Sequence, residues 1–141
     1  MKPTSFLIAI GASSAAAFPS TLHKRDCHES GVTWGAEKFL ALQTAQEYCD
    51  GKINGPFSTA GQYINKCVNL SSNKKMDFFL RYDSELPADG PPHAVEKNLC
   101  TEYFHREING CDHGGRSSYP ATEGGTGALT VSADPNEGNC A

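Results

Sequence analysis

Six cysteines are the feature that most limits what this chain of 141 residues can fold into. They are Cys27, Cys49, Cys67, Cys100, Cys111 and Cys140, and no two of them are spaced as a CxxC pair. In an oxidising compartment they would form three disulfides, each adding about 2 to 4 kcal/mol to the free energy of unfolding. Six cysteines can pair in many ways, so the sequence leaves the connectivity open.

The N-terminal residues predict such a compartment. An early lysine, an apolar run from Phe6 to Ile10 and a run of alanines are the parts of a secretory signal peptide, which we predict to span residues 1–17. Residues 18–25 would then be a short pro-segment that ends in a dibasic site. Residues 26–141 are expected to form a single secreted, extracellular, cysteine-rich domain, because no apolar stretch approaches the roughly 20 residues that span a membrane.

The charge of the secreted chain argues against one class of partner. Processing would remove Lys2, Lys24 and Arg25, which leaves nine Lys and Arg residues against sixteen Asp and Glu residues, a net charge of −7. A surface this acidic repels phosphate backbones, and no basic stripe is present. We therefore expect neutral ligands or a cationic partner, and no nucleic acid, membrane, metal or cofactor.

Two segments have the periodicity of amphipathic helices. The apolar positions of the first, in residues 34–49, are Phe39, Leu42, Ala45 and Cys49. Thr33 would cap its N-terminus, and Asp50 and Gly51 would end it. The second helix is expected in residues 93–109, with a stop at Gly110 in the left-handed region. Its apolar stripe contains Val95, Leu99, Cys100, Tyr103, Phe104 and Ile108.

Alternating apolar residues predict a β-hairpin and a later strand. The hairpin pairs residues 62–70 with residues 76–83, and its second strand would bury Met76, Phe78, Leu80 and Tyr82 on one face. Lys66 interrupts the apolar face of its first strand. Residues 114–127 are interpreted as a long glycine-rich loop, and residues 128–134 as the last strand.

The order helix, hairpin, helix, strand favours an α+β fold. We predict an α/β sandwich stapled by disulfides, with two helices packed on one face of a mainly antiparallel sheet and a short extended piece near Cys27. A right-handed return through the second helix would place the last strand beside the first hairpin strand. The last strand would then run antiparallel to the first hairpin strand and parallel to the second.

The segment EINGCDHGG at residues 107–115 has the residue types of a metal site. Four side chains in or beside it suit zinc: His105, Cys111, Asp112 and His113. Their spacing matches no local ligand motif, and Cys111 is expected to be oxidised. We therefore interpret the segment as a helix end at Asn109–Gly110, a disulfide at Cys111, and a Gly114–Gly115 turn with positive φ.

Acid–base catalysis is a weaker interpretation of the same region. His105 with Glu102 or Glu107 could form the acid–base pair that a secreted fungal-type ribonuclease uses. Positions 102 and 105 are neighbours on a helix surface, where such side chains are ordinarily solvated. We predict no enzyme and no catalytic residue. A secreted hydrolase or ribonuclease using His105, Glu107 and His113 is the lesser alternative.

Carbohydrate binding requires an aromatic plate and a few planar polar groups. Residues of these types include Trp34, Tyr63, Tyr82, Tyr119, Asp134 and Asn136. We take Trp34, Tyr119, Asp134 and Asn136 as the ligand-binding candidates, although Trp34 also suits the core and residues 134–136 also suit a turn. A sugar site would expose Trp34 or Tyr119 beside Asp134 or Asn136, whereas an enzyme would bring His113 against Glu107 in a cleft.

A glycosylation sequon lies next to the predicted hairpin turn. Asn69, Leu70 and Ser71 form the acceptor sequence Asn-x-Ser. The end of a surface strand is where an acceptor should lie, so we predict glycosylation at Asn69.

Three blocks of sequence carry a resemblance to a known family. They are CHESGVTWG at residues 27–35, LCTEYFHREINGCDHGG at 99–115 and SADPNEGNC at 132–140. Together they resemble the small secreted fungal domain of the Y-three type, named for a glycan-binding mushroom protein. The resemblance spans essentially the whole secreted chain. It implies a disulfide-bonded α/β sandwich, secretion, carbohydrate binding and homodimerisation through sheet edges.

Three functions remain open on this basis. The leading hypothesis is a secreted, non-catalytic glycan-binding protein of fungal type. The second is a small effector-like protein that binds a host protein, because the resemblance implies an aromatic before Asp134 and residues 128–131 contain none. The third is the secreted hydrolase.

Overall fold

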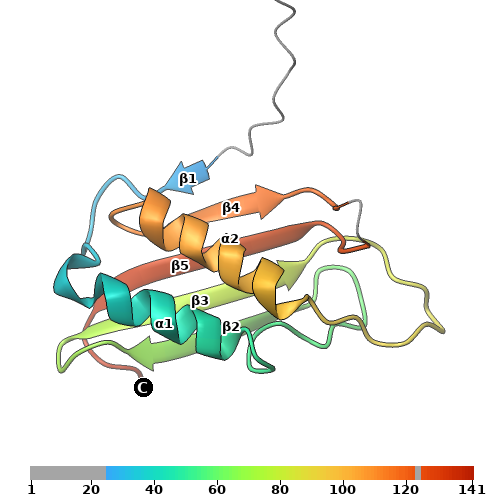
Figure 1. The fold of residues 1–141 in the computed structure, drawn as a ribbon, viewed down its shortest axis with the longest axis horizontal. Coiled ribbons are helices and arrows are strands. Elements are labelled where there is room, and N and C mark those ends of the chain that lie inside the picture. Colours follow the sequence, from blue (N-terminus) through green and yellow to red (C-terminus); the bar gives the residue numbers. More distant parts are fainter. Residues whose placement is uncertain (1–24, 123–124) are drawn as a thin grey trace, which may run out of the picture.

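The computed structural model describes residues 25–122 and 125–141. The predicted signal peptide and residues 18–24 of the predicted pro-segment lie outside the described residues. The elements in chain order are β1 (Arg25–Cys27), the 3-10 turn η1 (Gly35–Glu37), α1 (Lys38–Tyr48), β2 (Tyr63–Asn69), β3 (Lys74–Tyr82), α2 (Lys97–Gly110), β4 (Gly115–Tyr119) and β5 (Leu129–Glu137) (Figure 1).

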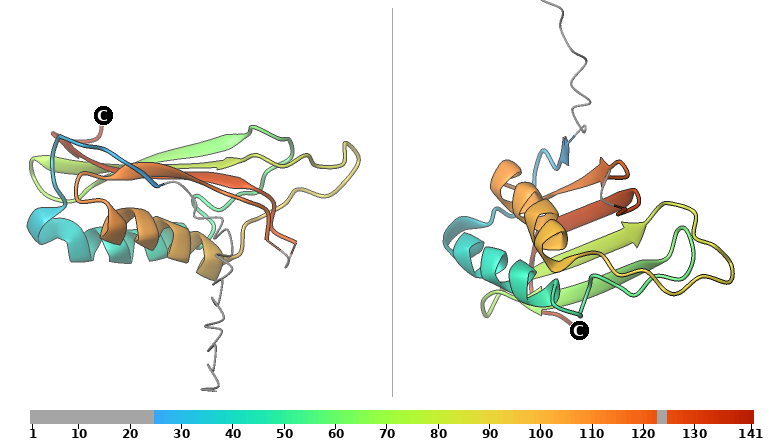
Figure 2. Two further views of the ribbon diagram at one scale, coloured as in Figure 1. Left: turned by 90° about the horizontal axis from the view of Figure 1, so that it is seen from above. Right: turned by 45° about the vertical axis from the view of Figure 1, so that its right-hand side comes forward.

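The five strands form one antiparallel sheet in the order β1-β4-β5-β3-β2. Both helices lie on the same face of this sheet (Figure 2). The other face carries no helix or strand of the described chain, and we call it the open face. The predicted α+β class, with two helices on one face of the sheet, is confirmed.

The predicted position of the last strand is wrong. β5 pairs with β3, the second strand of the hairpin, and runs antiparallel to it. The reason is β4, which occupies residues predicted to be part of a loop. The chain returns from α2 into β4, and the β4–β5 pair then brings β5 back between β4 and β3. Because of this additional strand, β5 runs antiparallel to β3, whereas the last strand was expected to run parallel to it.

The first helix buries the predicted Ala45 and Cys49 and packs the predicted Leu42 against the core, but it leaves the predicted Phe39 in solvent. Its buried residues are Ala41, Thr44 and Ala45, whereas Phe39 is 70% exposed. Small side chains let α1 approach its neighbours closely, and this contact outweighs the apolar pattern that contained Phe39. Thr33 is not the N-cap, because η1 precedes α1 and Glu37 occupies the cap position.

The second helix and the hairpin build most of the core. The predicted face of β3, Met76, Phe78, Leu80 and Tyr82, is buried, and Phe78 contacts Phe104 of α2 edge-on at 5.0 Å between ring centroids. α2 begins at Lys97 instead of His93, which pairs with Phe57 in an isolated β-bridge. Gly110 is the last residue of α2 and does not adopt a positive φ.

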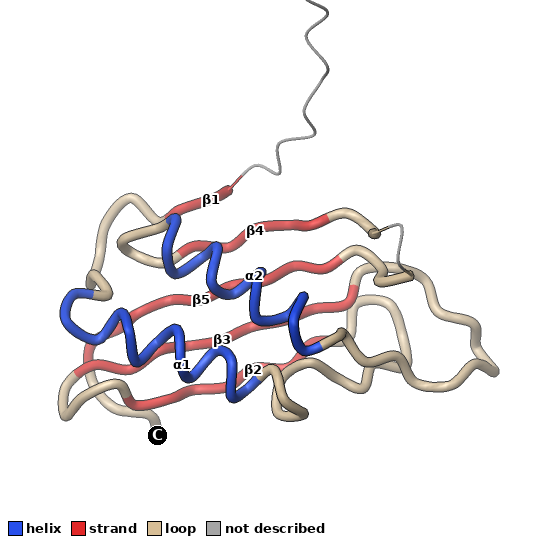
Figure 3. Tube along the Cα trace, viewed as in Figure 1, coloured by secondary structure: helices blue, strands red, loops and turns tan. Residues whose placement is uncertain are grey.

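Three disulfides connect these elements, as predicted from the six cysteines. Cys27–Cys111 joins β1 to the end of α2, Cys49–Cys100 joins the end of α1 to α2, and Cys67–Cys140 joins β2 to the C-terminal segment. Each bond links segments at least 51 residues apart in the sequence. The tube in Figure 3 shows the chain passing several times between the helices and the sheet.

No helix within residues 25–122 and 125–141 has the length and apolar character needed to span a bilayer.

Candidate functional site

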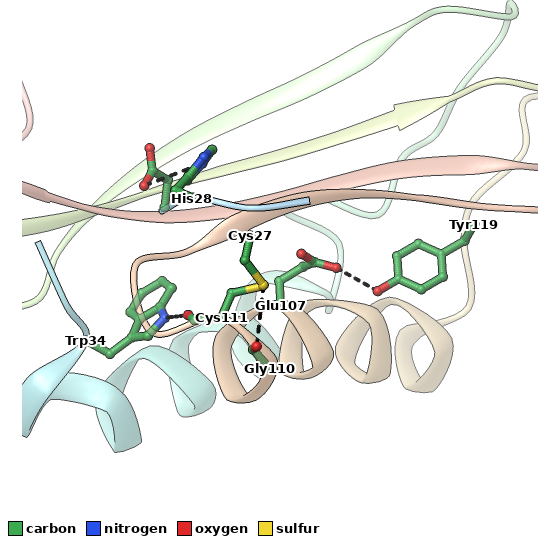
Figure 4. The surroundings of a disulfide bond; sticks show 8 residues. Cys27, His28, Trp34, Glu107, Gly110, Cys111 and Tyr119 are labelled. Carbon is green, nitrogen blue, oxygen red and sulfur yellow. Dashed lines mark hydrogen bonds and ion pairs between the residues drawn. A yellow bond between two sulfur atoms is a disulfide. The ribbon is translucent and has the colours of Figure 1, made fainter. Parts of the chain in front are cut away.

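Two of the four predicted ligand-binding residues are in the core. Trp34 is 1% exposed, and its indole Nε1 donates a 2.8 Å hydrogen bond to the carbonyl of Cys111 (Figure 4). Tyr119 is 3% exposed and stacks on Tyr103 at 3.9 Å between ring centroids. Neither ring can lie against a ligand from solvent, so the expected sugar plate is not at these positions.

The catalytic candidates His105, Glu107 and His113 do not converge, and Glu102, the other candidate beside His105, is paired with Arg106. His105 Nε2 lies 2.9 Å from the carbonyl oxygen of Leu42, and His113 Nδ1 lies 2.9 Å from that of Gly31. Glu107 is fully buried and accepts a hydrogen bond from Tyr119. The three side chains therefore serve separate contacts, and the cleft joining His113 to Glu107 that an enzyme would need is not formed.

The zinc interpretation also fails on the bonding of Cys111. Its sulfur is bonded to Cys27 and is not available as a thiolate. Among residues 25–122 and 125–141, no group of three His, Cys, Asp or Glu side chains could hold a metal ion. The structure instead gives the predicted disulfide and the predicted positive φ at Gly114, which is +77°. The predicted positive φ at Gly115 is wrong, because Gly115 begins the extended strand β4.

Strand register gathers a different set of residues on the open face. Residues directly opposite one another in an antiparallel pair point to the same face. Asp77 is opposite Asp134, and Phe79 is opposite Ser132, which is in turn opposite Arg116 of β4. Phe78 and Leu80 face the helices, and side chains alternate along a strand. Asp77 and Phe79, together with the residues opposite them, therefore point to the open face.

The C-terminal part of β5 is a strand where a turn was an ordinary expectation. β4 pairs with β5 only as far as Ala133, so no strand lies beside Pro135 on that side. Pro135 has no backbone N–H, and a strand tolerates this at a position where no hydrogen bond is required. Asp134 and Asn136 thus remain in register with β3, and both lie on the open face. These are the two predicted ligand-binding residues that the structure leaves accessible.

An aromatic pair lies on the same face. Tyr63 of β2 and Phe79 of β3 stack with ring centroids 5.4 Å apart and an interplanar angle of 27°. Tyr63 is 56% exposed, and the guanidinium carbon of Arg116 lies 4.2 Å from the centroid of Phe79. The contacts on Phe79 fix its orientation, and stacking on Phe79 holds Tyr63 as a plate open to solvent.

Planar polar groups lie next to this plate. Asn136 Nδ2 donates a 2.8 Å hydrogen bond to Asp77 Oδ2 and lies 3.3 Å from Asp134 Oδ2. Two carboxylates directly opposite each other repel, and the amide between them offsets that repulsion. Each carboxylate can accept about four hydrogen bonds, so oxygen lone pairs remain for a ligand.

These groups line a shallow depression of about 660 Å³ on the open face, which we call the sheet groove. Its lining includes Tyr63, Asn65, Asp77, Phe79, Arg116, Ser132 and Asp134. Its charged side chains on the open face are Asp77, Asp134 and Arg116. Lys66 contributes only its part of the strand, because it is directly opposite the inward-facing Phe78 and shares its face. The sheet groove therefore carries carboxylate and guanidinium groups close together.

Sequence reasoning missed Asp77, Phe79 and Arg116. One signal for Phe79 was present, because it is an apolar residue at a position where the alternation of β3 calls for a polar one. Arg116 carried no signal, since β4 was not recognised.

No protein-family model, curated protein or solved structure matches this chain.

Proposed function

We propose that this chain is a secreted, non-catalytic glycan-binding protein and that the sheet groove is its binding site. The observation that carries this proposal is the Tyr63–Phe79 stack, which presents an exposed aromatic plate beside Asp77, Asp134 and Asn136. A pyranose ring has an apolar face of C–H groups and a rim of hydroxyls. The plate suits the face, and the carboxylate and amide groups suit the rim.

The mixed charges of the sheet groove favour a neutral glycan. Two carboxylates and one guanidinium group line it, so a polyanion would be repelled by Asp77 and Asp134 and a polycation would be repelled by Arg116. Hydroxyl and acetamido groups can use both kinds of side chain, because they donate and accept hydrogen bonds.

Two further observations support the proposal. The predicted leader and the three disulfides suit an extracellular protein, where free glycans and glycoproteins are encountered. The three sequence blocks that resemble the Y-three type also favour carbohydrate binding. In this proposal Tyr63 provides the aromatic ring for stacking on a sugar, the role that was predicted for Trp34 and Tyr119.

The test is a glycan-array screen of the oxidised chain that begins at Asp26, with a reduced and alkylated sample as control. We expect binding to neutral glycans that is lost on reduction and lost in Tyr63→Ala. The matched control is Phe39→Ala, since Phe39 is an exposed aromatic on α1, across the sheet from the groove. A blank array would refute the proposal and favour a host protein as the partner. Equal loss in both variants would refute the assignment of the site.

A further inference from the structure

A second depression adjoins the sheet groove. It measures about 330 Å³ and is lined by three segments: residues 28–32, His113, and residues 134–136. We call it the loop pocket. Each segment comes from one of the three sequence blocks singled out above, so the fold brings these distant blocks together at one place.

The loop pocket is held by covalent and backbone bonds. The Cys27–Cys111 disulfide fixes the start of the loop, and the His28 N–H donates a 2.9 Å hydrogen bond to the carbonyl of Gly114. His113 Nδ1 lies 2.9 Å from the carbonyl of Gly31. A loop fixed at both ends loses little further entropy when a ligand binds.

Asp134 joins the two depressions, because it lines both. Asn136 also connects them, since it lines the loop pocket and bonds to Asp77 of the sheet groove. Tyr63 of the sheet groove is on β2 and His28 of the loop pocket follows β1, and the four gaps between these edge strands, at about 4.8 Å each, amount to roughly 19 Å. That distance is longer than a single sugar ring.

The side chains of the loop pocket have unused hydrogen-bonding groups. His28 Nε2 lies 3.9 Å from Asp134 Oδ1, which is too far for a hydrogen bond between them. Their side chains are 44% and 33% exposed, so both can reach a ligand from solvent. An imidazole and a carboxylate at this spacing can together hold one hydroxyl or acetamido group, one donating and the other accepting.

We infer that the loop pocket is a second sugar subsite and that the ligand is a neutral oligosaccharide lying across the strands. One ring would stack on Tyr63 in the sheet groove, and a later residue of the same chain would reach His28 and Asp134 in the loop pocket. This inference rests on the proposed function, because it takes the occupant of the sheet groove to be a glycan.

The test compares His28→Ala with the unaltered chain on an array of neutral oligosaccharides that runs from monosaccharide to hexasaccharide. We expect unaltered binding to strengthen with length, and His28→Ala to weaken only the longer members, by about five- to tenfold. Tyr63→Ala should weaken every member. His105→Ala is the matched control, since His105 lies on α2 away from both depressions, and it should retain the length dependence.

The outcomes separate the two proposals. Binding that depends on Tyr63 but not on length or on His28 would overturn the second subsite and leave the proposed function standing. Absence of binding to every member by the unaltered chain would overturn both.

Discussion

The hydroxyl of Tyr119 donates a 2.7 Å hydrogen bond to Oε1 of Glu107, and both side chains are buried. Glu107 belongs to α2 and Tyr119 to β4, so this bond connects the helix layer to the sheet beside the Cys27–Cys111 disulfide (Figure 4). The other carboxyl oxygen of Glu107 has no hydrogen-bond partner within the described residues. Tyr119 therefore offsets much of the unfavourable free energy of burying this group.

Tyr119→Phe should lower the free energy of unfolding by about 1 to 3 kcal/mol, because it leaves a buried carboxyl group with one bond fewer. The measurement is urea unfolding with the disulfides intact. Tyr103→Phe is the matched control, since the stacked Tyr103 makes no hydroxyl hydrogen bond in the described part of the chain. Equal losses in both variants would show that the bond to Glu107 contributes nothing specific.

Tyr103 should make the fold sensitive to alkaline pH. Burial raises the pKa of Tyr103 above its ordinary value of 10.0, and Glu102 adds to the effect while Arg106 opposes it. The folded chain then holds the phenol proton more tightly than the unfolded chain does. The resulting stability is complete below pH 10.0 and is lost as the pH rises through the folded pKa. Melting temperatures of the unaltered chain should fall more steeply over this range than those of Tyr103→Phe, and parallel curves would contradict the prediction.

The sequence was sufficient to predict the fold class but not the path of the chain. The six cysteines and the alternation in β3 are local features, and the structure confirms the three disulfides and the buried face of β3 predicted from them. β4 could not be recognised, because its inward positions are Gly115, Ser117 and Tyr119. Small residues are needed there, since a Cβ at Gly115 would lie 2.9 Å from the sulfur of Cys111. Close packing of α2 on the sheet thus removed the apolar pattern that identifies a strand.

The sequence predicted only the polar half of the candidate site, because the exposure of an aromatic ring depends on the packing of the fold. Asp134 and Asn136 were chosen for their side-chain chemistry, which the fold leaves accessible. Trp34 and Tyr119 were chosen for the same reason, but burial of an aromatic ring depends on contacts that only the fold reveals. Tyr63 becomes a fixed plate through Phe79, a contact that depends on the β2–β3 register.

Loss of the disulfides should have unequal effects. The pairs are separated by 51 residues for Cys49–Cys100 and 73 for Cys67–Cys140, and the entropy of loop closure changes only slowly with length. The two disulfides differ more in burial than in loop length, because Cys49 and Cys100 are fully buried and Cys67 is exposed. We expect Cys49→Ala with Cys100→Ala to cost about 1 to 2 kcal/mol more than Cys67→Ala with Cys140→Ala, through the cavity it leaves. Chemical unfolding of the two double variants measures the difference, and a larger loss from the exposed pair would contradict it.

Asn69 should carry a glycan when the chain passes through a eukaryotic secretory pathway. Asn69 is exposed at the end of β2, and its Oδ1 accepts a 2.7 Å hydrogen bond from the backbone N–H of Cys140. Ser71→Ala removes the acceptor sequence while keeping that bond. Intact-mass analysis should show a mass that an endoglycosidase reduces, and Ser71→Ala should lack it. An unmodified mass for the unaltered chain would show that the sequon is not used.

Gly114→Ala should damage both the fold and the proposed binding site. Gly114 has a φ of +77°, and a Cβ there would lie 2.5 Å from the carbonyl oxygen of Ala133 and 2.8 Å from the Cα of Asp134. Positive φ contributes about 1 to 2 kcal/mol and overpacking about 1 to 3 kcal/mol, so we expect a loss of roughly 2 to 5 kcal/mol in the free energy of unfolding. Gly51→Ala isolates the first contribution, since Gly51 has a φ of +94° and no atom within 4 Å of its added Cβ. Its loss should stay near 1 to 2 kcal/mol.

The same pair of variants separates backbone strain from damage to the groove. The atoms that a Cβ at Gly114 would meet belong to Ala133, Asp134 and Pro135, and Asp134 lines both depressions. Relief of the overlap must move this part of β5, so folded Gly114→Ala should bind neutral oligosaccharides more weakly on the array than folded Gly51→Ala does. The comparison is made well below the melting temperature of each variant, with native disulfides confirmed by the absence of free thiols. If folded Gly114→Ala retains full binding, β5 can shift without affecting the ligand, and Asp134 does not belong to the site.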